Sequence, residues 1–195
     1  MTNDHHRSKD EIHDYWVNNS FPDRYKNKVE RSEFLTPHVK KYVDKDAKVL
    51  EIGCNVGRNL NHLFEHGYEQ LSGIDISEEA LQELKKSFPK LADKADLNNA
   101  SVEDFIPTLQ DGQFDMVFTM AVLEHIHPDS EWIFNEIVRI TSGYLIIVEA
   151  ENYNHWRVFP RKYKEIFTGL GMQQVYEMPC EAAGLKKYTM RVFKK

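Results

Sequence analysis

A glycine-bearing turn that follows an apolar run is the part of the sequence best suited to chemistry. Residues 47–52 are mostly apolar, and the chain then passes through Gly53 and Gly57 into a helical pattern. Glycine lets the backbone approach a ligand closely, and a helix N-terminus presents free N–H groups. A second apolar run ends at Asp75, whose carboxylate could accept both hydroxyls of a ribose. This order of features is typical of a nucleoside-binding βαβ unit.

The spacing of the glycines bears on which nucleoside the turn would bind. A dinucleotide fingerprint needs glycines at the first, third and sixth positions of the turn, whereas this turn has Asn55 at the third position and no glycine at the sixth. Asparagine tolerates a positive φ better than most residues, so Asn55 can still form the bend. The turn therefore provides poorly for a diphosphate, and it predicts a ligand that has a nucleoside and no phosphates.

Three segments of the chain, in the same order, resemble the class I S-adenosylmethionine-dependent methyltransferases. Residues 51–57 (EIGCNVG) resemble the E/D-x-G-x-G-x-G loop of that family, with Asn55 in place of the central glycine. Asp75 resembles the family's ribose-binding acid, and residues 114–126 resemble its fourth strand and the loop after it. The resemblance covers roughly residues 41 to 150 at the level of motifs. It implies a methyltransferase that uses S-adenosyl-L-methionine as its cofactor.

The length and the alternation of elements indicate one α/β domain. A chain of 195 residues with 41% hydrophobic residues is long enough to bury a core. The resemblance implies a doubly wound, mostly parallel seven-stranded sheet with helices on both faces, a C-terminal antiparallel hairpin and an N-terminal helical lid. The apolar runs predict strands at residues 47–52, 71–75, 99–102, 114–119, 144–149, 173–178 and 188–193.

The chain before the sheet is expected to form the lid. We assign residues 1–40 to this lid, with about the first ten residues mobile, and residues 41–195 to the Rossmann-like methyltransferase domain. Within the lid, Thr36 is expected to cap a helix whose first position is Pro37.

Charge and cysteine content limit the partners and the compartment. The net charge of −6 argues against a nucleic-acid partner, because phosphate contacts need clustered Lys and Arg. Two cysteines fit a reducing cytoplasm. No apolar run approaches the length of a membrane span, and the first residues lack the apolar core of a signal peptide. We expect a cytoplasmic monomer or homodimer that binds neither membrane nor nucleic acid.

Ligands of open α/β sheets bind beyond the carboxyl ends of the strands, and the resemblance implies cofactor-binding residues there. The predicted set runs from the methionine end of the cofactor through the ribose and adenine to the transfer path: Glu51, Gly53, Cys54, Asn55, Gly57, Asp75, Ile76, Ser101, Val102, Thr119 and Met120. Purely structural readings stay open for several of them. The glycines could serve the turn alone, Asp75 could cap the next helix, Ser101 could be a polar strand end, and Cys54 could be a small packing residue.

The acceptor side is expected to involve His125 and the segment after residue 149. His125 follows the fourth strand and could act as a general base or brace its loop. His155, Arg157 and Arg161 could hold an anionic substrate group. Aromatic residues could supply flat walls or close over the cofactor, or could simply be core contacts: Tyr15, Trp16, Tyr153 and Trp156. The spacing of the histidines and acids matches no strong ligand motif, so we expect no metal.

The leading hypothesis is an enzyme that transfers methyl groups to a small-molecule acceptor, which could bear an anionic group. Arginines after residue 149 favour a carboxylate or a phosphate on that acceptor. A non-catalytic S-adenosylmethionine-binding regulatory protein is the alternative, and a protein or nucleic-acid methyltransferase is a weaker one. A nicotinamide-dependent oxidoreductase is disfavoured by the glycine spacing. Tight binding of NAD without binding of S-adenosylhomocysteine would identify the oxidoreductase, whereas cofactor binding without methyl transfer would identify the regulatory protein.

Overall fold

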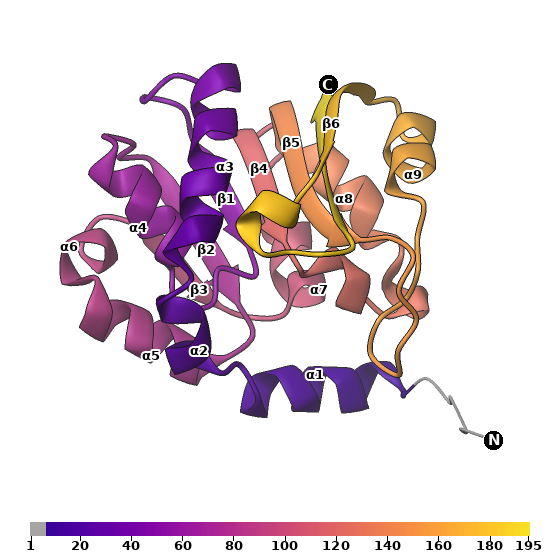
Figure 1. Cartoon of the computed structure of the whole chain (residues 1–195), viewed down its shortest axis with the longest axis horizontal. Helices are drawn as coiled ribbons and strands as arrows, with labels where there is room; N and C mark the ends of the chain where they lie inside the picture. The colour runs from indigo at the N-terminus through magenta and orange to yellow at the C-terminus, as the bar shows by residue number, and fades with distance from the viewer. Residues whose placement is uncertain (1–6) are drawn as a thin grey trace.

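The computed structural model describes residues 7–195, and a seven-stranded sheet lies at its centre (Figure 1). The strand order is β3-β2-β1-β4-β5-β7-β6. Strands β1 to β5 are parallel to one another, whereas β7 runs antiparallel to both β5 and β6. The bounds are β1 Val49–Ile52, β2 Leu71–Asp75, β3 Asp96–Asn99, β4 Phe114–Met120, β5 Thr141–Ala150, β6 Gln173–Pro179 and β7 Tyr188–Lys194. The predicted doubly wound seven-stranded sheet with its C-terminal antiparallel hairpin is confirmed.

Helices cover both faces of this sheet, in two groups (Figure 1). Helices α3 to α6 bury Leu35, Leu60 and Leu84 on one face, and α7 to α9 bury Ile137 and Phe167 on the other. The bounds are α1 Lys9–Asn18, α2 Pro22–Lys26, α3 Val29–Tyr42, α4 Arg58–Glu65, α5 Glu78–Ser87, α6 Pro89–Ala92, α7 Val102–Phe105, α8 Ile133–Ile140 and α9 Tyr163–Gly169. Short 3₁₀ turns lie at Ile106–Thr108, Leu123–His125, Pro128–Ser130 and Glu181–Ala183.

The parallel strands β1, β2 and β4 end level with one another, which places their carboxyl ends side by side. Ile52 pairs with Ile74 of β2 and with Thr119 of β4. All four residues of β1 are buried, as expected for a parallel strand covered on both faces. Successive side chains of a strand point to opposite faces, so Leu50 and Ile52 pack against the α8 side. Glu51 therefore faces α4, where it meets Asn59.

Helix α1 lies across the edge of the sheet where these strands end (Figure 1). Most of the segment predicted to be mobile lies outside the described residues, but its last two residues, Lys9 and Asp10, begin α1. Ser8 caps this helix, and Glu11 completes a capping box with Ser8. Helix α3 continues past residue 40, and the division into a lid and a main domain stays a prediction.

Two predictions about local structure were wrong. The third strand was expected at residues 99–102, but β3 ends at Asn99, and Ser101 instead caps α7. Thr36 was expected to cap a helix that begins at Pro37, whereas α3 begins at Val29 and runs through Pro37. Pro37 is exposed, while Leu35, Thr36 and Val39 are buried around it. Burial of that face offsets the hydrogen bond that proline cannot donate.

No helix in the described part of the chain combines the length and the apolar character needed to cross a membrane. The cytoplasmic location and the monomeric or homodimeric state stay predictions.

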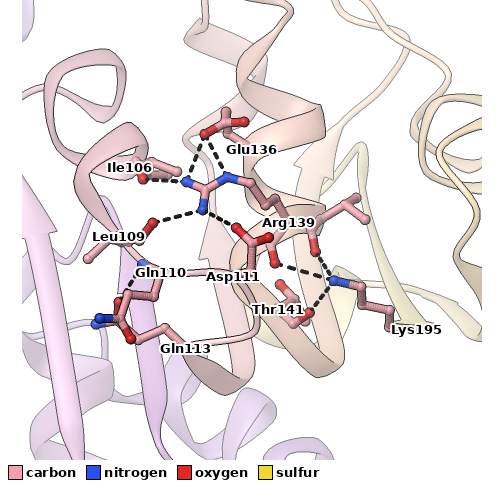
Figure 2. A network of polar contacts seen from close by, with 10 residues as sticks. Ile106, Leu109, Gln110, Asp111, Gln113, Glu136, Arg139, Thr141 and Lys195 are labelled. Atoms are coloured by element: carbon pink, nitrogen blue, oxygen red, sulfur yellow. Dashed lines mark hydrogen bonds and ion pairs between the residues drawn. The ribbon is translucent and has the colours of Figure 1, made fainter.

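Arg139 on α8 connects the segments that lead into β4 and β5, at the end of the sheet opposite α1. Figure 2 shows the guanidinium of Arg139 between Glu136 and the segment from Ile106 to Asp111. It donates to the carbonyl oxygens of Leu109 at 2.7 Å and Ile106 at 3.1 Å. The Lys195 ammonium donates to the last carbonyls of α8 and to Thr141, which complements the helix C-terminus (Figure 2).

Replacing Arg139 should therefore weaken the fold without touching the opposite edge of the sheet. We expect Arg139→Gln to lower the free energy of unfolding by about 1–3 kcal/mol, because charged hydrogen bonds to carbonyl and carboxylate oxygens are lost. Urea unfolding of the variant and of the unmodified chain measures this difference. A free energy within 0.3 kcal/mol or so of the unmodified chain would mean that water replaces the guanidinium at no cost.

Candidate active site

A cavity of about 460 Å³ opens at the carboxyl ends of β1, β2 and β4. Its walls come from α1, the turn after β1, the end of β2, the start of α7, the loop after β4 and the segment before β7. The volume is in the range of sites for small molecules and cofactors. The cavity lies at the point where the strand order reverses, between β1 and β4. This is the place where open α/β sheets bind ligands.

The turn after β1 has the positive φ angles that its sequence predicts. Gly53, Asn55 and Gly57 have φ values of 71°, 48° and 66°. A Cβ atom on Gly53 would lie 2.3 Å from Val122, and one on Gly57 would lie 2.3 Å from Leu84. Both glycines are therefore required by contacts within the protein. Three members of the predicted set, Gly53, Cys54 and Asn55, also line the cavity, whereas Gly57 does not.

Asn55 makes contacts that glycine could not make at this position. Its side-chain nitrogen Nδ2 donates to the carbonyl oxygen of Ser20, between α1 and α2, at 2.9 Å. Its side-chain oxygen accepts the N–H of Val56. The turn is therefore fixed both to the following residue and to the segment that covers the cavity.

Asp75 lines the cavity and holds the turn at the same time. Its Oδ2 accepts the backbone N–H of Asn55 at 2.8 Å, and its Oδ1 accepts the N–H of Ser77 at 2.9 Å. Ser77 itself caps α5. Each carboxylate oxygen retains a second lone pair for a ligand hydroxyl. Burial raises the pKa of Asp75, against the effect of the two N–H donors.

Glu51 is a buried acid with one oxygen left over. Its Oε1 accepts the side-chain N–H of Asn59 at 2.7 Å, while Oε2 has no partner. Burial raises the pKa of Glu51 to about 8, although the bond from Asn59 and the charge of Arg58 oppose the rise. A cation bound beside Oε2 would favour the ionised form.

Unsatisfied polar atoms gather around this cavity. Within residues 7–195, six buried side-chain nitrogen or oxygen atoms have no hydrogen-bond partner: those of Trp16, Ser20, Arg31, Glu51, Arg157 and Tyr163. All of these residues except Tyr163 line the cavity. Buried polar groups are normally paired, so the free atoms indicate that a ligand completes the site. Because Glu51 is an acid and Arg31 a base, that ligand should carry both an ammonium and a carboxylate near the turn.

The end predicted to bind adenine is lined by Ile76, Ser101 and Val102. The Ser101 hydroxyl accepts the N–H of Asp104 at 3.1 Å and donates to its carboxylate at 2.7 Å. It is therefore engaged as the cap of α7. Among these residues, a role in reading adenine fits Ile76 and the start of α7 better than the Ser101 hydroxyl.

On β4 the two predicted residues differ. Met120 lines the cavity, but Thr119 does not. Thr119 is fully buried, and its hydroxyl donates to Glu149 Oε1 at 2.7 Å. The pleat of the strand explains the difference, because successive side chains point to opposite faces of the sheet. Thr119 contacts the site only through Glu149.

Two glutamates that sequence reasoning missed hold the loop after β4. Glu149, at the end of β5, accepts the backbone N–H groups of Val122 and Glu124. Glu124 in turn accepts the backbone N–H of Ala150 at 2.7 Å. Burial raises the pKa of both carboxyls. The sequence signal for Glu149 was an acid inside an otherwise apolar strand, because a buried carboxylate needs hydrogen-bond donors.

His125 braces this loop. Its Nδ1 lies 2.7 Å from the carbonyl oxygen of Arg157, so that nitrogen must carry the proton. Burial lowers the pKa of His125 to about 4, so the ring is neutral near pH 7. Trp16 of α1 packs on the imidazole, with ring centroids 4.5 Å apart. The bracing role has direct geometric support, and a role as general base stays a prediction.

The residues predicted to bind substrate separate into two pairs. Trp16 and Arg157 line the cavity, whereas Tyr15 and His155 do not. Tyr15 packs edge-on against Trp156, and His155 forms an isolated bridge with Val158. The Arg157 guanidinium lies 5.0 Å from the Tyr15 ring and 5.5 Å from the Trp16 ring.

Arg161, which could have held an anion, is buried elsewhere. It donates to the carbonyl oxygens of Leu123 and Ile126 and pairs with Glu131. Each of its three nitrogens thus has a partner, and two of them hold the loop after β4. Along the described residues from Arg7 onward, no group of three or more His, Cys, Asp or Glu side chains is arranged to hold a metal ion.

Comparisons with known proteins agree with this geometry. A family model described as a methyltransferase domain matches residues 50–147, about half of the chain. The chain therefore belongs to the methyltransferase domain family, and its loop and fold place it among the class I S-adenosylmethionine-dependent methyltransferases. The predicted enzyme class and the predicted cofactor are confirmed at this level. The nicotinamide-dependent alternative is left without support.

Curated relatives include several ubiquinone biosynthesis O-methyltransferases. The protein of Aromatoleum aromaticum is 29% identical over 131 residues, which cover 57% of this chain and 55% of the relative. The mitochondrial protein of Candida albicans is 27% identical over 177 residues, which cover 86% of this chain and 49% of the relative. The chain spans about half the length of the curated relatives it matches.

Solved structures show the same fold at low identity. Magnesium protoporphyrin IX methyltransferase from Synechocystis PCC 6803, crystallised with bound S-adenosylmethionine, has a TM-score of 0.72 at 17% identity, covering 95% of this chain and 94% of that one. The 1,6-didemethyltoxoflavin-N1-methyltransferase of Burkholderia thailandensis has a TM-score of 0.70 at 18% identity, covering 95% and 86%.

The residues around the cavity fit S-adenosylmethionine. The unpaired oxygen of Glu51 suits the α-ammonium, and the unpaired donors of Ser20 and Arg31 suit the α-carboxylate. Asp75 retains acceptor capacity for the ribose hydroxyls, and Ile76 offers an apolar surface for the adenine. Sequence reasoning missed Ser20 and Arg31 because they precede β1 and lie outside the motifs.

Removing the Asp75 carboxylate should weaken cofactor binding. We expect Asp75→Ala to reduce the affinity for S-adenosylhomocysteine by about 1.5–3 kcal/mol, the scale of hydrogen bonds to a charged group. Isothermal titration calorimetry measures the change, and a melting curve of the variant shows whether the turn is still folded. A folded variant with unchanged affinity would remove Asp75 from the site.

Cofactor binding should also release a proton from Glu51. With a pKa of about 8, Glu51 is protonated in the free protein at pH 7, and a bound ammonium favours its ionised form. Affinity for S-adenosylhomocysteine should therefore rise from pH 6 to about pH 8 and level off above it. Calorimetry in buffers of different ionisation enthalpy counts the released proton. The Glu51→Gln variant should release none, and equal release from both proteins would contradict the assignment.

Proposed function

We propose that the chain transfers a methyl group from S-adenosylmethionine to a small-molecule acceptor that carries an anionic group. The observation that carries the anionic part is Arg157, whose Nε is buried without a partner in the cavity wall. Lys186 and Lys187 line the same cavity. Across residues 7–195, none of these three cations forms a salt bridge with an acid.

Three unpaired cations at one place are notable in a chain of net charge −6. Arg157 is stacked among aromatic rings, and Lys187 Nζ lies 4.9 Å from the centre of the Tyr153 ring. Arg157 is half-buried, whereas Lys186 and Lys187 are exposed, so the guanidinium is the cation for which the fewest water molecules compete with an anion. A carboxylate or phosphate on the acceptor would satisfy this wall of the cavity.

When bound, S-adenosylmethionine supplies a methyl group that is already activated for transfer, so the protein has to align the acceptor and exclude water. Helix α1 contributes to both tasks, because Ile12, His13 and Trp16 form part of the cavity wall. His13 pairs with Glu103 at the start of α7, at 3.2 Å. This contact holds α1 over the carboxyl ends of the strands.

The relatives support a small acceptor. Those cited above are named for ubiquinone biosynthesis, for magnesium protoporphyrin IX and for 1,6-didemethyltoxoflavin, and none of these names refers to a macromolecular substrate.

Labelled cofactor tests the proposal directly. We expect the protein, given methyl-labelled S-adenosylmethionine and a metabolite extract, to form a labelled compound that an anion-exchange resin retains. The Arg157→Gln variant should form about ten times less product or lower, with its affinity for S-adenosylhomocysteine within twofold of the unmodified chain. Arg139→Gln serves as the matched control, because this arginine lies at the opposite edge of the sheet.

Each other outcome has a clear meaning. A labelled product that the resin does not retain, or full activity of Arg157→Gln, would contradict an anionic acceptor. Tight binding of S-adenosylhomocysteine with no labelled product from any extract would favour the non-catalytic binding protein.

A further inference from the structure

A tyrosine, a glutamate and a histidine meet at one wall of the cavity. Tyr188, the first residue of β7, donates its hydroxyl to Glu124 Oε1 at 2.7 Å. His125 Nε2 lies 3.5 Å from the same oxygen. All three residues line the cavity, although they come from segments more than sixty residues apart. The cofactor-binding residues described above do not include Tyr188 or Glu124.

The hydrogen bonds of this group leave a place for one more proton. Glu124 Oε2 accepts the N–H of Ala150, and Oε1 accepts the hydroxyl of Tyr188, so both oxygens act as acceptors. His125 must donate from Nδ1 to the carbonyl oxygen of Arg157, which leaves a lone pair on Nε2. That lone pair faces a carboxylate oxygen, and neither atom brings a proton to the contact. A proton added to Glu124 would be held between the two.

We propose that Tyr188 and Glu124 take the proton that the acceptor loses when it is methylated. The inference rests on the proposed function, and it applies to an acceptor that reacts through an O–H or N–H group. The lone pair of the acceptor atom forms the bond to the methyl carbon as the bond between that carbon and the sulfonium sulfur breaks, and the electrons of the broken bond stay on the sulfur. The O–H or N–H bond of the acceptor then breaks, and the electrons stay on the acceptor. The released proton bonds to the Tyr188 oxygen as the phenolic proton passes to Glu124 Oε1.

This step leaves the charges balanced. Tyr188 is neutral before and after it, and Glu124 changes from carboxylate to carboxylic acid. The neutral Nε2 of His125 can then accept a hydrogen bond from the new O–H group. His125 thus positions the acid, and its own buried Nδ1–H is committed to the Arg157 carbonyl.

The surroundings of Glu124 suit a group that is ionised at rest and can hold a proton. It is faced by Arg157 from the segment after β5, Glu149 from β5, Tyr188 from β7, Tyr163 from α9 and its neighbour His125. Burial raises the pKa of Glu124, whereas the Tyr188 and Ala150 donors and the charge of Arg157 oppose the rise. A base is most effective when its pKa lies near the working pH.

The cations beside Tyr188 would bring the acceptor to it. Lys186 and Lys187 directly precede Tyr188, and Lys187 has a φ of 75°, which is uncommon for a side chain other than glycine or asparagine. An anion held by these lysines and by Arg157 therefore lies close to the phenol. The residues that would bind the acceptor and the residues that would take its proton belong to one continuous wall.

Two variants test the inference: Tyr188→Phe, which removes only the hydroxyl, and Glu124→Gln. With labelled S-adenosylmethionine and the metabolite extract as the probe, we expect the initial rate of labelling at pH 7 to fall by about tenfold or more in both. The deficit should shrink as the pH rises, because hydroxide can then remove the acceptor proton. Affinity for S-adenosylhomocysteine should stay within twofold. Tyr176→Phe is the matched control, since this phenol lies on β6 and contacts Met178.

The outcomes separate this inference from the proposed function. Labelling by Tyr188→Phe at the unmodified rate at every pH would overturn the inference alone. A deficit of the same size at every pH would also overturn it, because a structural role predicts no dependence on hydroxide. If Glu124→Gln melts far below the unmodified protein, the pH profile of Tyr188→Phe decides. Absence of labelling by the unmodified protein, despite good cofactor binding, would overturn the proposed function and the inference together.

Discussion

Buried carboxylates that accept backbone N–H groups from neighbouring loops hold this site together. Asp75 at the end of β2 fixes the turn after β1, and Glu149 at the end of β5 fixes the loop after β4. Glu124 completes the second of these contacts by accepting the N–H of Ala150. Buried N–H groups must be paired, and a loop has no ladder of its own to pair them. Acids at the ends of strands accept the N–H groups of these loops, in place of the carbonyl oxygens of a neighbouring strand. These hydrogen bonds fix the shape of the cavity.

Much of this arrangement is local in sequence, which is why it could be predicted. The turn at residues 51–57 and the acid at Asp75 depend on short-range geometry: positive φ at Gly53 and Asn55, and a carboxylate at the end of a strand. The doubly wound sheet with its C-terminal antiparallel hairpin followed from a resemblance carried by the same segments. Strand β3 was misplaced because its residues are only partly buried, so they show no clear apolar period.

The parts of the site that could not be predicted depend on contacts between distant segments. Tyr188 meets Glu124 across the β5–β7 pairing, and Arg31 reaches the cavity from a helix that covers one face of the sheet. Thr119 sits next to Met120 in sequence but points away from the cavity. Sequence spacing identifies the residues that follow a strand. The face of the sheet toward which each side chain points, and the residue that it contacts on another strand, are known only from the folded structure.

Asn55 couples the turn after β1 to the segment that covers the cavity, because its side-chain amide donates to the Ser20 carbonyl oxygen. A glycine there would remove this bond and leave the contact of Arg58 with the Tyr25 carbonyl oxygen to connect the two. A ligand that changes the conformation of the turn must also change the hydrogen bond of Asn55. Displacement of the covering segment must then change the affinity of the turn for that ligand, by the same coupling free energy. Asn55, at the position where the family motif has a glycine, thus joins Arg58 in coupling occupancy of the turn to the covering segment.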